Sequence, residues 1–198
     1  MSKYTSKILV PIGFSEQSMI ALGQAFNLAR IKDSKVVLLS VVEDQNIIES
    51  LFLDDKSHEL QEAVKNKLLK IASQYSDKYS VHTDVMVAKG KVYSQINEVA
   101  QMIGANLIIM GTDGKPNKGV KRFIGSNAER VVRLAKCPVI TIKGKDHRDG
   151  CKNIILPLDL EKETKEKVTY ALEYARYWDA TIRIVSVVFK GDDEVRTR

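Results

Sequence analysis

Five short runs rich in Val, Ile and Leu recur between Lys7 and Lys143, and segments with helical periodicity separate them. The runs read KILVPIG, KVVLLSVV, SVHTDVMVA, ANLIIM and PVITIK. Several are apolar without alternation, so both faces of these strands should be buried, as in a parallel sheet that helices cover on both sides. Strict alternation of strand and helix predicts an α/β fold with a doubly wound, open, five-stranded parallel sheet and right-handed crossovers.

Four helices are expected between and beside these strands. The first starts near Ser15, a residue type that favours the N-cap, and the second runs from about Asp55 to Gln74. The third follows Gly90, and the fourth begins at Ser126. Helical periodicity directs one set of apolar side chains toward the sheet. That set is Leu22, Ala25, Phe26, Ala29, Leu60, Val64, Leu68, Ile71, Ile96, Val99, Ile103, Ala128, Val131, Val132 and Ala135.

The opening pattern returns after the polar connection GKDHRDG, Gly144 to Gly150. NIILPLDLEKETKEKVTYALEYARYWDATIRIVSVV lies over KILVPIGFSEQSMIALGQAFNLARIKDSKVVLLSVV without a gap, and Pro157 matches Pro11 at a displacement of 146 positions (157 − 11). We therefore predict a first domain at residues 1–146 and a partial second repeat (β-α-β) at 151–198. Half a parallel sheet has no closed core, so we expect the second repeat to lean on other residues, as part of a longer tandem protein.

Composition excludes several classes of protein. The net charge of +6 comes from lysines and arginines spread over all 198 residues, without an aromatic-rich basic face, so no nucleic-acid partner is expected. The apolar runs are far shorter than the roughly 18 residues of a membrane span, and the N-terminus lacks a secretory signal. We expect a cytoplasmic protein without membrane contact. The two cysteines, Cys137 and Cys151, have no metal-site or redox spacing and are expected to be reduced thiols.

The stretch MGTDGKPNKGVKRFIGSNAERV, Met110 to Val131, follows the fourth predicted strand directly. The strand should deliver Gly111 at the carboxyl edge of the sheet, where open α/β sheets bind ligands. Glycine permits positive φ and a close approach of the backbone to a ligand, so Gly111 and Gly114 could direct N–H groups toward phosphate oxygens. Gly125 and Ser126 open the next helix, whose N–H groups and dipole attract anions.

Basic residues lie between these glycines and raise the local positive potential, which suits a polyanion. They are Lys115, Lys118, Lys121 and Arg122. An ordinary turn followed by a helix cap is the alternative interpretation, because Ser126 and Glu129 also have the spacing of a capping box. Local features leave both interpretations open.

The order of several motifs resembles the universal stress proteins. The motifs are KILVPIGFSEQS, SVVED, VAKGKV and LIIMGTDG…IGSNAERVVRLAKCPVITIK, and they cover about Lys7 to Lys143. The resemblance implies a Rossmann-like fold of the adenine nucleotide alpha hydrolase-like type that binds ATP, or ADP or AMP, with Mg²⁺ possible. It implies phosphate and ribose contacts at Gly111, Gly114, Gly125 and Ser126, flanked by Met110 and Asn127. Adenine and ribose would lie against Pro11, Ile12, Gly13 and Val41. Pairing through the last strand, Val139 to Lys143, implies a homodimer or an intrachain pseudo-dimer.

This sequence departs from the family pattern at two places. The segment between Gly114 and Gly125 is one residue longer than in that pattern, so the loop must bulge. Gly13 replaces the usual acidic residue after Pro-x and removes a carboxylate that could hold the ribose or position a metal. The segment Gln45 to Asp55 is unusually apolar. It is expected to form a lid over the crevice, a contact with a partner, or a short helix that covers the sheet edge.

Three functions remain open at this stage. The first is a stress-response sensor or regulator that binds an adenine nucleotide and acts through dimer or partner contacts. The second is a scaffold of the same fold that binds no nucleotide and acts by self-association. A slow ATPase ranks last, since no catalytic residue is evident and His58, His82 and His147 lie in unrelated segments.

Overall fold

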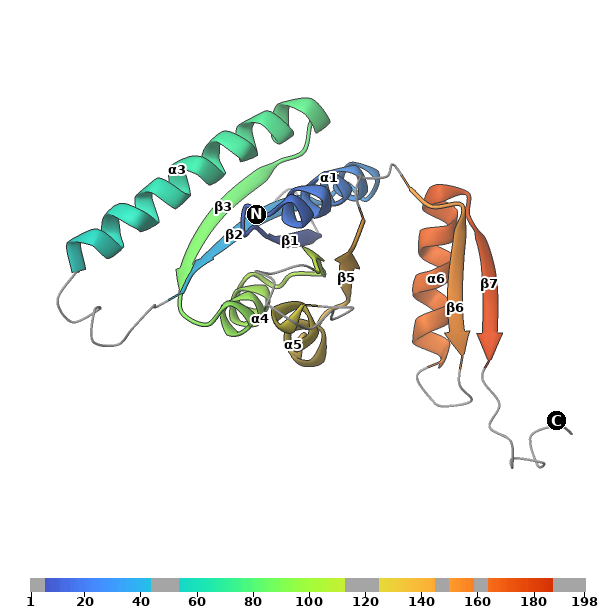
Figure 1. The fold of residues 1–198 in the computed structure, drawn as a ribbon. Coiled ribbons are helices and arrows are strands. Elements are labelled where there is room, and N and C mark those ends of the chain that lie inside the picture. Colours follow the sequence, from blue (N-terminus) through green and yellow to red (C-terminus); the bar gives the residue numbers. More distant parts are fainter. Residues whose placement is uncertain (1–5, 44–53, 113–124, 145–149, 159–163, 187–198) are drawn as a thin grey trace, which may run out of the picture. The chain divides into compact units, whose positions relative to one another are not determined.

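The computed structural model describes residues 6–43, 54–112, 125–144, 150–158 and 164–186, and Figure 1 shows their fold. The chain divides into two compact units, Met1–His147 (unit 1) and Arg148–Arg198 (unit 2). Each unit is described by itself. Among the helices of the described residues, none is long and apolar enough to cross a lipid bilayer.

Unit 1 contains a five-stranded parallel sheet with the strand order β3-β2-β1-β4-β5. The predicted doubly wound α/β fold is therefore confirmed. The strands are β1 (Lys7–Pro11), β2 (Lys35–Val42), β3 (Thr83–Lys89), β4 (Leu107–Gly111) and β5 (Val139–Ile142). The helices with described bounds are α1 (Glu16–Ile31), α3 (Asp54–Tyr79), α4 (Val92–Ile103) and α5 (Ser126–Leu134).

Helices cover both faces of this sheet, as the uninterrupted apolar strands predicted (Figure 1). On one face, side chains of α4 and α5 pack with alternate residues of the central strands. The buried cluster on this face consists of Leu9, Val37, Leu39, Ile96, Val99, Ala100, Ile108, Met110, Ala128 and Val131. On the other face, α1 and α3 pack against each other through Phe26, whose ring centroid lies 5.2 Å from that of Tyr75.

Two side chains predicted to be buried are exposed instead. Leu60 is 51% exposed, and Val132 is 49% exposed. The 26 residues of α3 span about 39 Å, whereas the seven residues of β3 span about 23 Å, so the helix extends beyond the strand it covers. Leu60 lies in that overhang, and the helix ends at Tyr79, five residues later than predicted. Val132 lies beside the buried Val131 on the solvent side of α5.

Unit 2 is a β-α-β element with β6 (Asn153–Leu158), α6 (Thr164–Trp178) and β7 (Thr181–Ser186). The pairs Lys7↔Lys35 and Asn153↔Thr181 are related by the same displacement of 146 positions (153 − 7 and 181 − 35), so both sheets share one register. Ile155 is 68% exposed, although its counterpart Leu9 is fully buried under α4 and α5. Within the described part of unit 2, one face of the two-stranded sheet is thus open to solvent.

Candidate functional site

The strand order of unit 1 reverses between β1 and β4, which are neighbours in the sheet. In open α/β sheets, ligands bind in the crevice outside the carboxyl ends of the strands at such a reversal. The chain leaves β1 into α1 and leaves β4 toward α5, so both helix N-termini lie on this edge. We call the carboxyl ends of β1 and β4, with the first turns of α1 and α5, the rim.

The β1 side of the rim contains the residues predicted to contact adenine and ribose. Pro11 is half-buried at the end of β1, and Ile12 is buried with its N–H donating to the carbonyl of Leu39 at 2.7 Å. Gly13 is exposed, and beyond its two chain neighbours no atom of the described residues lies within 4 Å of where its Cβ would be. Val41 is half-buried near the end of the adjacent strand β2. These four residues therefore lie at neighbouring strand ends.

The next residue, Phe14, has an unusual backbone conformation, with φ of 57°. Non-glycine residues in this region are uncommon, and such conformations cluster at functional sites. The ammonium of Lys67 from α3 lies 4.1 Å from the centroid of the Phe14 ring, which is a cation–π distance. Sequence reasoning did not identify either residue, because no local pattern signals a left-handed phenylalanine.

Gly111 is required at the end of β4 for space rather than for positive φ. A Cβ atom there would lie 2.7 Å from the carbonyl carbon of Gln17 and 2.9 Å from the amide nitrogen of Ser18. The positive-φ glycines of the described residues are Gly90, Gly104 and Gly144, so the expected use of positive φ at Gly111 is wrong. Its absent side chain lets the first turn of α1 approach β4 directly.

The N–H of Gly111 still points to the β1 side of the rim. The N–H of Thr112 donates to the carbonyl of Ile142 in β5 at 3.1 Å. Because successive amides of a strand point to opposite neighbours, the Gly111 amide is directed toward β1. The side chain of Met110 is buried in the core cluster on the α4 and α5 face, so only its backbone borders the rim.

Helix α5 begins directly beside the end of β4. The N–H of Gly125 donates to the carbonyl of Thr112 at 2.7 Å, and Gly125 is the N-cap of the helix. Ser126 is therefore the first helical residue and Gly125 the N-cap, so the capping box of Ser126 with Glu129 in the alternative interpretation does not form. Ser126 is exposed, and Asn127 is half-buried.

The first turn of α5 has the properties of an anion site. The amides of Ser126 and Asn127 have no intrahelical acceptor, and the described residues provide no other acceptor for them. The positive end of the helix dipole points the same way. Gly114 and the four basic residues of the loop fall in 113–124, outside the described residues, as does most of the expected lid.

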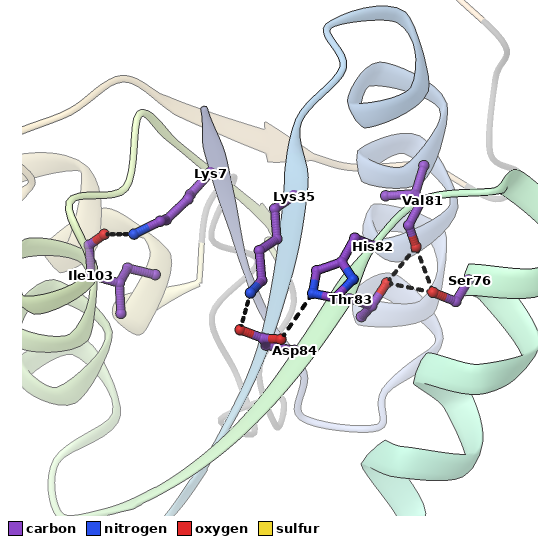
Figure 2. A network of polar contacts seen from close by, with 8 residues as sticks. All are labelled: Lys7, Lys35, Ser76, Val81, His82, Thr83, Asp84 and Ile103. Carbon is purple, nitrogen blue, oxygen red and sulfur yellow. Dashed lines mark hydrogen bonds and ion pairs between the residues drawn. The ribbon is translucent and has the colours of Figure 1, made fainter. Parts of the chain in front are cut away.

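A second polar cluster lies at the opposite end of the sheet, where β2 and β3 begin (Figure 2). The carboxylate of Asp84 forms an ion pair with the ammonium of Lys35 and lies 3.5 Å from Nε2 of His82. A cavity of about 250 Å³ nearby is lined by Arg30, Lys78 and other residues at the C-terminal ends of α1 and α3. Cationic side chains at helix C-termini stabilise the negative end of the dipole, which accounts for Arg30 and Lys78 beside this cavity.

The described residues show neither an activated thiol nor a metal site. Burial raises the pKa of the Cys137 thiol, which keeps it protonated at neutral pH. Within the residues that the structure describes, no three His, Cys, Asp or Glu side chains form a group that could hold a metal ion. The rim thus offers backbone amides and a serine hydroxyl, which are groups that bind anions.

Comparison with known proteins assigns unit 1 to a family. The model of the universal stress protein family matches residues 5–143. Universal stress protein MJ0531 of Methanocaldococcus jannaschii is 34% identical over 145 residues, covering 69% of this chain and 81% of the relative. Universal stress protein MJ0577 of the same organism is 31% identical over 163 residues, covering 74% of this chain and 99% of the relative.

Solved structures agree with this assignment. The structure of MJ0577 has a TM-score of 0.63 at 29% identity and covers 71% of this chain and 97% of that chain. A universal stress protein from Archaeoglobus fulgidus has a TM-score of 0.74 and covers 96% of this chain and 70% of that chain. At 20% identity, the latter shows a likeness of fold alone. With the family model matched over most of its length, the chain belongs to the universal stress protein family.

Proposed function

We propose that this protein is a cytoplasmic stress-response regulator that binds ATP, or ADP or AMP, at the rim of unit 1. The observation that carries the proposal is the 2.7 Å hydrogen bond from the Gly125 amide to the Thr112 carbonyl. It holds the anion-binding first turn of α5 against the end of β4, beside the reversal of strand order.

In this proposal, different residues of the rim contact different parts of the nucleotide. Pro11, Ile12, Gly13 and Val41 accommodate adenine and ribose at the ends of β1 and β2. The triphosphate lies along the amides at Gly111 and at the first turn of α5, with the Ser126 hydroxyl donating to a phosphate oxygen. The remaining proposed contacts are Met110, Gly114 and Asn127. Mg²⁺ would be held mainly by the phosphates, since the described residues offer it no cluster of acidic ligands.

Thermal unfolding with and without nucleotide tests this proposal. At free ATP about 100 times its dissociation constant, binding adds about 2.7 kcal/mol to the free energy of unfolding, which raises Tm by several degrees. Ser126→Asp places a negative charge at the phosphate position, while an acidic residue in the first turn suits the helix itself. We expect this variant to keep its own Tm and to lose the ATP-dependent shift.

Ser126→Ala is the matched neutral control for that variant. It removes one hydroxyl donor but leaves the amides and the dipole, so it should reduce the shift without abolishing it. An unchanged Tm of the wild-type protein with ATP, ADP and AMP would refute nucleotide binding. An equal ATP shift in the wild-type and Ser126→Asp proteins would refute the position of the site.

A scaffold without nucleotide is the second candidate, and Gly13 favours it. This residue is exposed and has no side chain where a carboxylate could hold the ribose. The two candidates differ in what the freshly purified protein carries. An adenine nucleotide released on denaturation and identified by mass spectrometry would exclude the scaffold.

We also propose that unit 1 pairs through the outer edge of β5, in a homodimer or in an intrachain pseudo-dimer. Strand β5 is last in the sheet and has β4 as its only strand neighbour among the described residues. The shared register of the two sheets supports the assignment of residues 151–198 as a partial repeat.

Edge pairing through β5 can be tested with one proline. Thr112 donates to the carbonyl of Ile142, so by alternation the N–H of Thr141 points away from β4. Thr141→Pro therefore blocks the outer edge without removing a bond to β4. Light scattering should show a smaller assembly for this variant than for the wild-type protein. An unchanged mass would exclude a homodimer that pairs through this edge.

A further inference from the structure

One side chain joins two strand ends at the rim of unit 1. Gln17 lies in the first turn of α1, and its carboxamide forms two hydrogen bonds with the backbone of Gly144, 127 residues away in sequence. Nε2 donates to the Gly144 carbonyl at 2.5 Å, and the Gly144 amide donates to Oε1 at 3.3 Å. This pairing fixes the backbone directly after β5.

The main chain of Gln17 is equally constrained. Its carbonyl carbon and oxygen would lie 2.7 and 2.8 Å from a Cβ at Gly111, so the first turn of α1 rests on the end of β4. A single residue thus contacts β4 through its backbone and the end of β5 through its side chain. Movement of either strand end would be transmitted to the other through Gln17.

A further set of hydrogen bonds continues this connection to α5. The carbonyl of Ile142 accepts from the amide of Thr112 at 3.1 Å and from its Oγ1 at 3.3 Å. Thr112 is 3% exposed, so these bonds are shielded from water. Its own carbonyl accepts from the Gly125 amide at the start of α5. Gln17 is therefore linked through Gly144, Ile142 and Thr112 to the first turn of α5.

We propose that Gln17 is a positioning residue for phosphate binding, and this inference rests on the proposed nucleotide site. Gln17 holds the backbone after β5, which in turn fixes Thr112 and the orientation of the α5 amides. Anion binding by backbone amides depends on their orientation, because the donors must already converge on the oxygens. Loss of the carboxamide bonds should weaken contacts to the phosphates and leave contacts to the base unchanged.

Gln17→Met tests the proposal, because methionine has a similar length and volume but cannot form the two bonds. Gln101→Met is the matched control, since Gln101 is an exposed glutamine in the last turn of α4. For all three full-length proteins, titration calorimetry measures the Kd of ATP and competition measures that of adenosine. Hydrogen exchange of the Gly144 amide reports on the bond itself.

We expect Gln17→Met to weaken ATP binding about three- to tenfold, as for two exposed hydrogen bonds, with adenosine binding unchanged within about twofold. The Gly144 amide should exchange faster, and Gln101→Met should match the wild-type protein. Unchanged ATP affinity with faster Gly144 exchange would refute the positioning role. Equal weakening of ATP and adenosine would also refute it. No ATP binding by the wild-type protein would refute the proposed function, and this inference with it.

Discussion

Substitution of Gly111 by alanine offers a direct test of how β4 and α1 pack. The added Cβ would lie 2.7 Å from the carbonyl carbon of Gln17, 2.8 Å from its oxygen and 2.9 Å from the nitrogen of Ser18. These are backbone atoms of a helix, so no rotation of a side chain can relieve the overlap. Overpacking costs about 1–3 kcal/mol, and we expect Gly111→Ala to fall in the upper half of that range.

Gly13→Ala is the matched control on the same rim. Beyond its two chain neighbours, no atom of the described residues lies within 4 Å of its Cβ position, and its φ is not positive, so alanine fits without strain. The substitution should leave the stability unchanged or raise it by up to about 1 kcal/mol, because alanine restricts the unfolded chain.

Urea unfolding followed by far-UV circular dichroism measures both variants, with thermal melts in parallel. A loss of about 2–3 kcal/mol corresponds to a fall in Tm of about 5–10 °C for a unit of this size. If the Gly111→Ala variant were as stable as the wild-type protein, the close approach of α1 to β4 would be refuted. Equal destabilisation by Gly13→Ala would show that the loss reflects any change at the rim and not this contact.

Three further predictions concern residues away from the rim. Phe26→Ala should lower the free energy of unfolding by about 3–5 kcal/mol in urea titrations, because this fully buried ring joins α1 to α3; a loss below about 1 kcal/mol would contradict that packing. Gly150→Ala should change the emission of Trp178, the only tryptophan, because the new Cβ would lie 2.8 Å from its indole Cδ1; an unchanged spectrum would argue against this contact. Burial raises the pKa of Cys137, so its alkylation at pH 8 should be slower than that of free cysteine and should accelerate at higher pH. Mass spectrometry measures the extent of alkylation over time, and equal rates for Cys137 and free cysteine at pH 8 would contradict the burial of this thiol.

Much of the fold was predictable, because short stretches of sequence indicate the strands and the buried faces of the helices. The uninterrupted apolar runs predicted five parallel strands, and all five occur in unit 1. The residues Leu22, Phe26 and Ile96 were predicted to be buried from helical periodicity alone, and they are fully buried. Periodicity failed at Leu60, because it tells which face of a helix is apolar but not how far the sheet beneath that face extends.

The candidate site was only partly predictable. The glycines and the serine of the family motif identify the edge of the sheet, and the structure places Gly111 and Gly125 together there through Thr112. The motif did not reveal that Gly111 accommodates α1, nor that Gln17 pairs with Gly144. Neither contact has a local signature, because each joins residues about a hundred or more positions apart in the chain.

The amino-acid sequence by itself determined the alternation of strands and helices and the family, since both depend on residue types at fixed spacing. The tertiary structure alone decided which glycine serves packing and which lies open, and which side chains brace the rim. The physical reason is that steric overlap and hydrogen bonding depend on distances between distant segments, and those distances exist only after the helices have packed on the sheet.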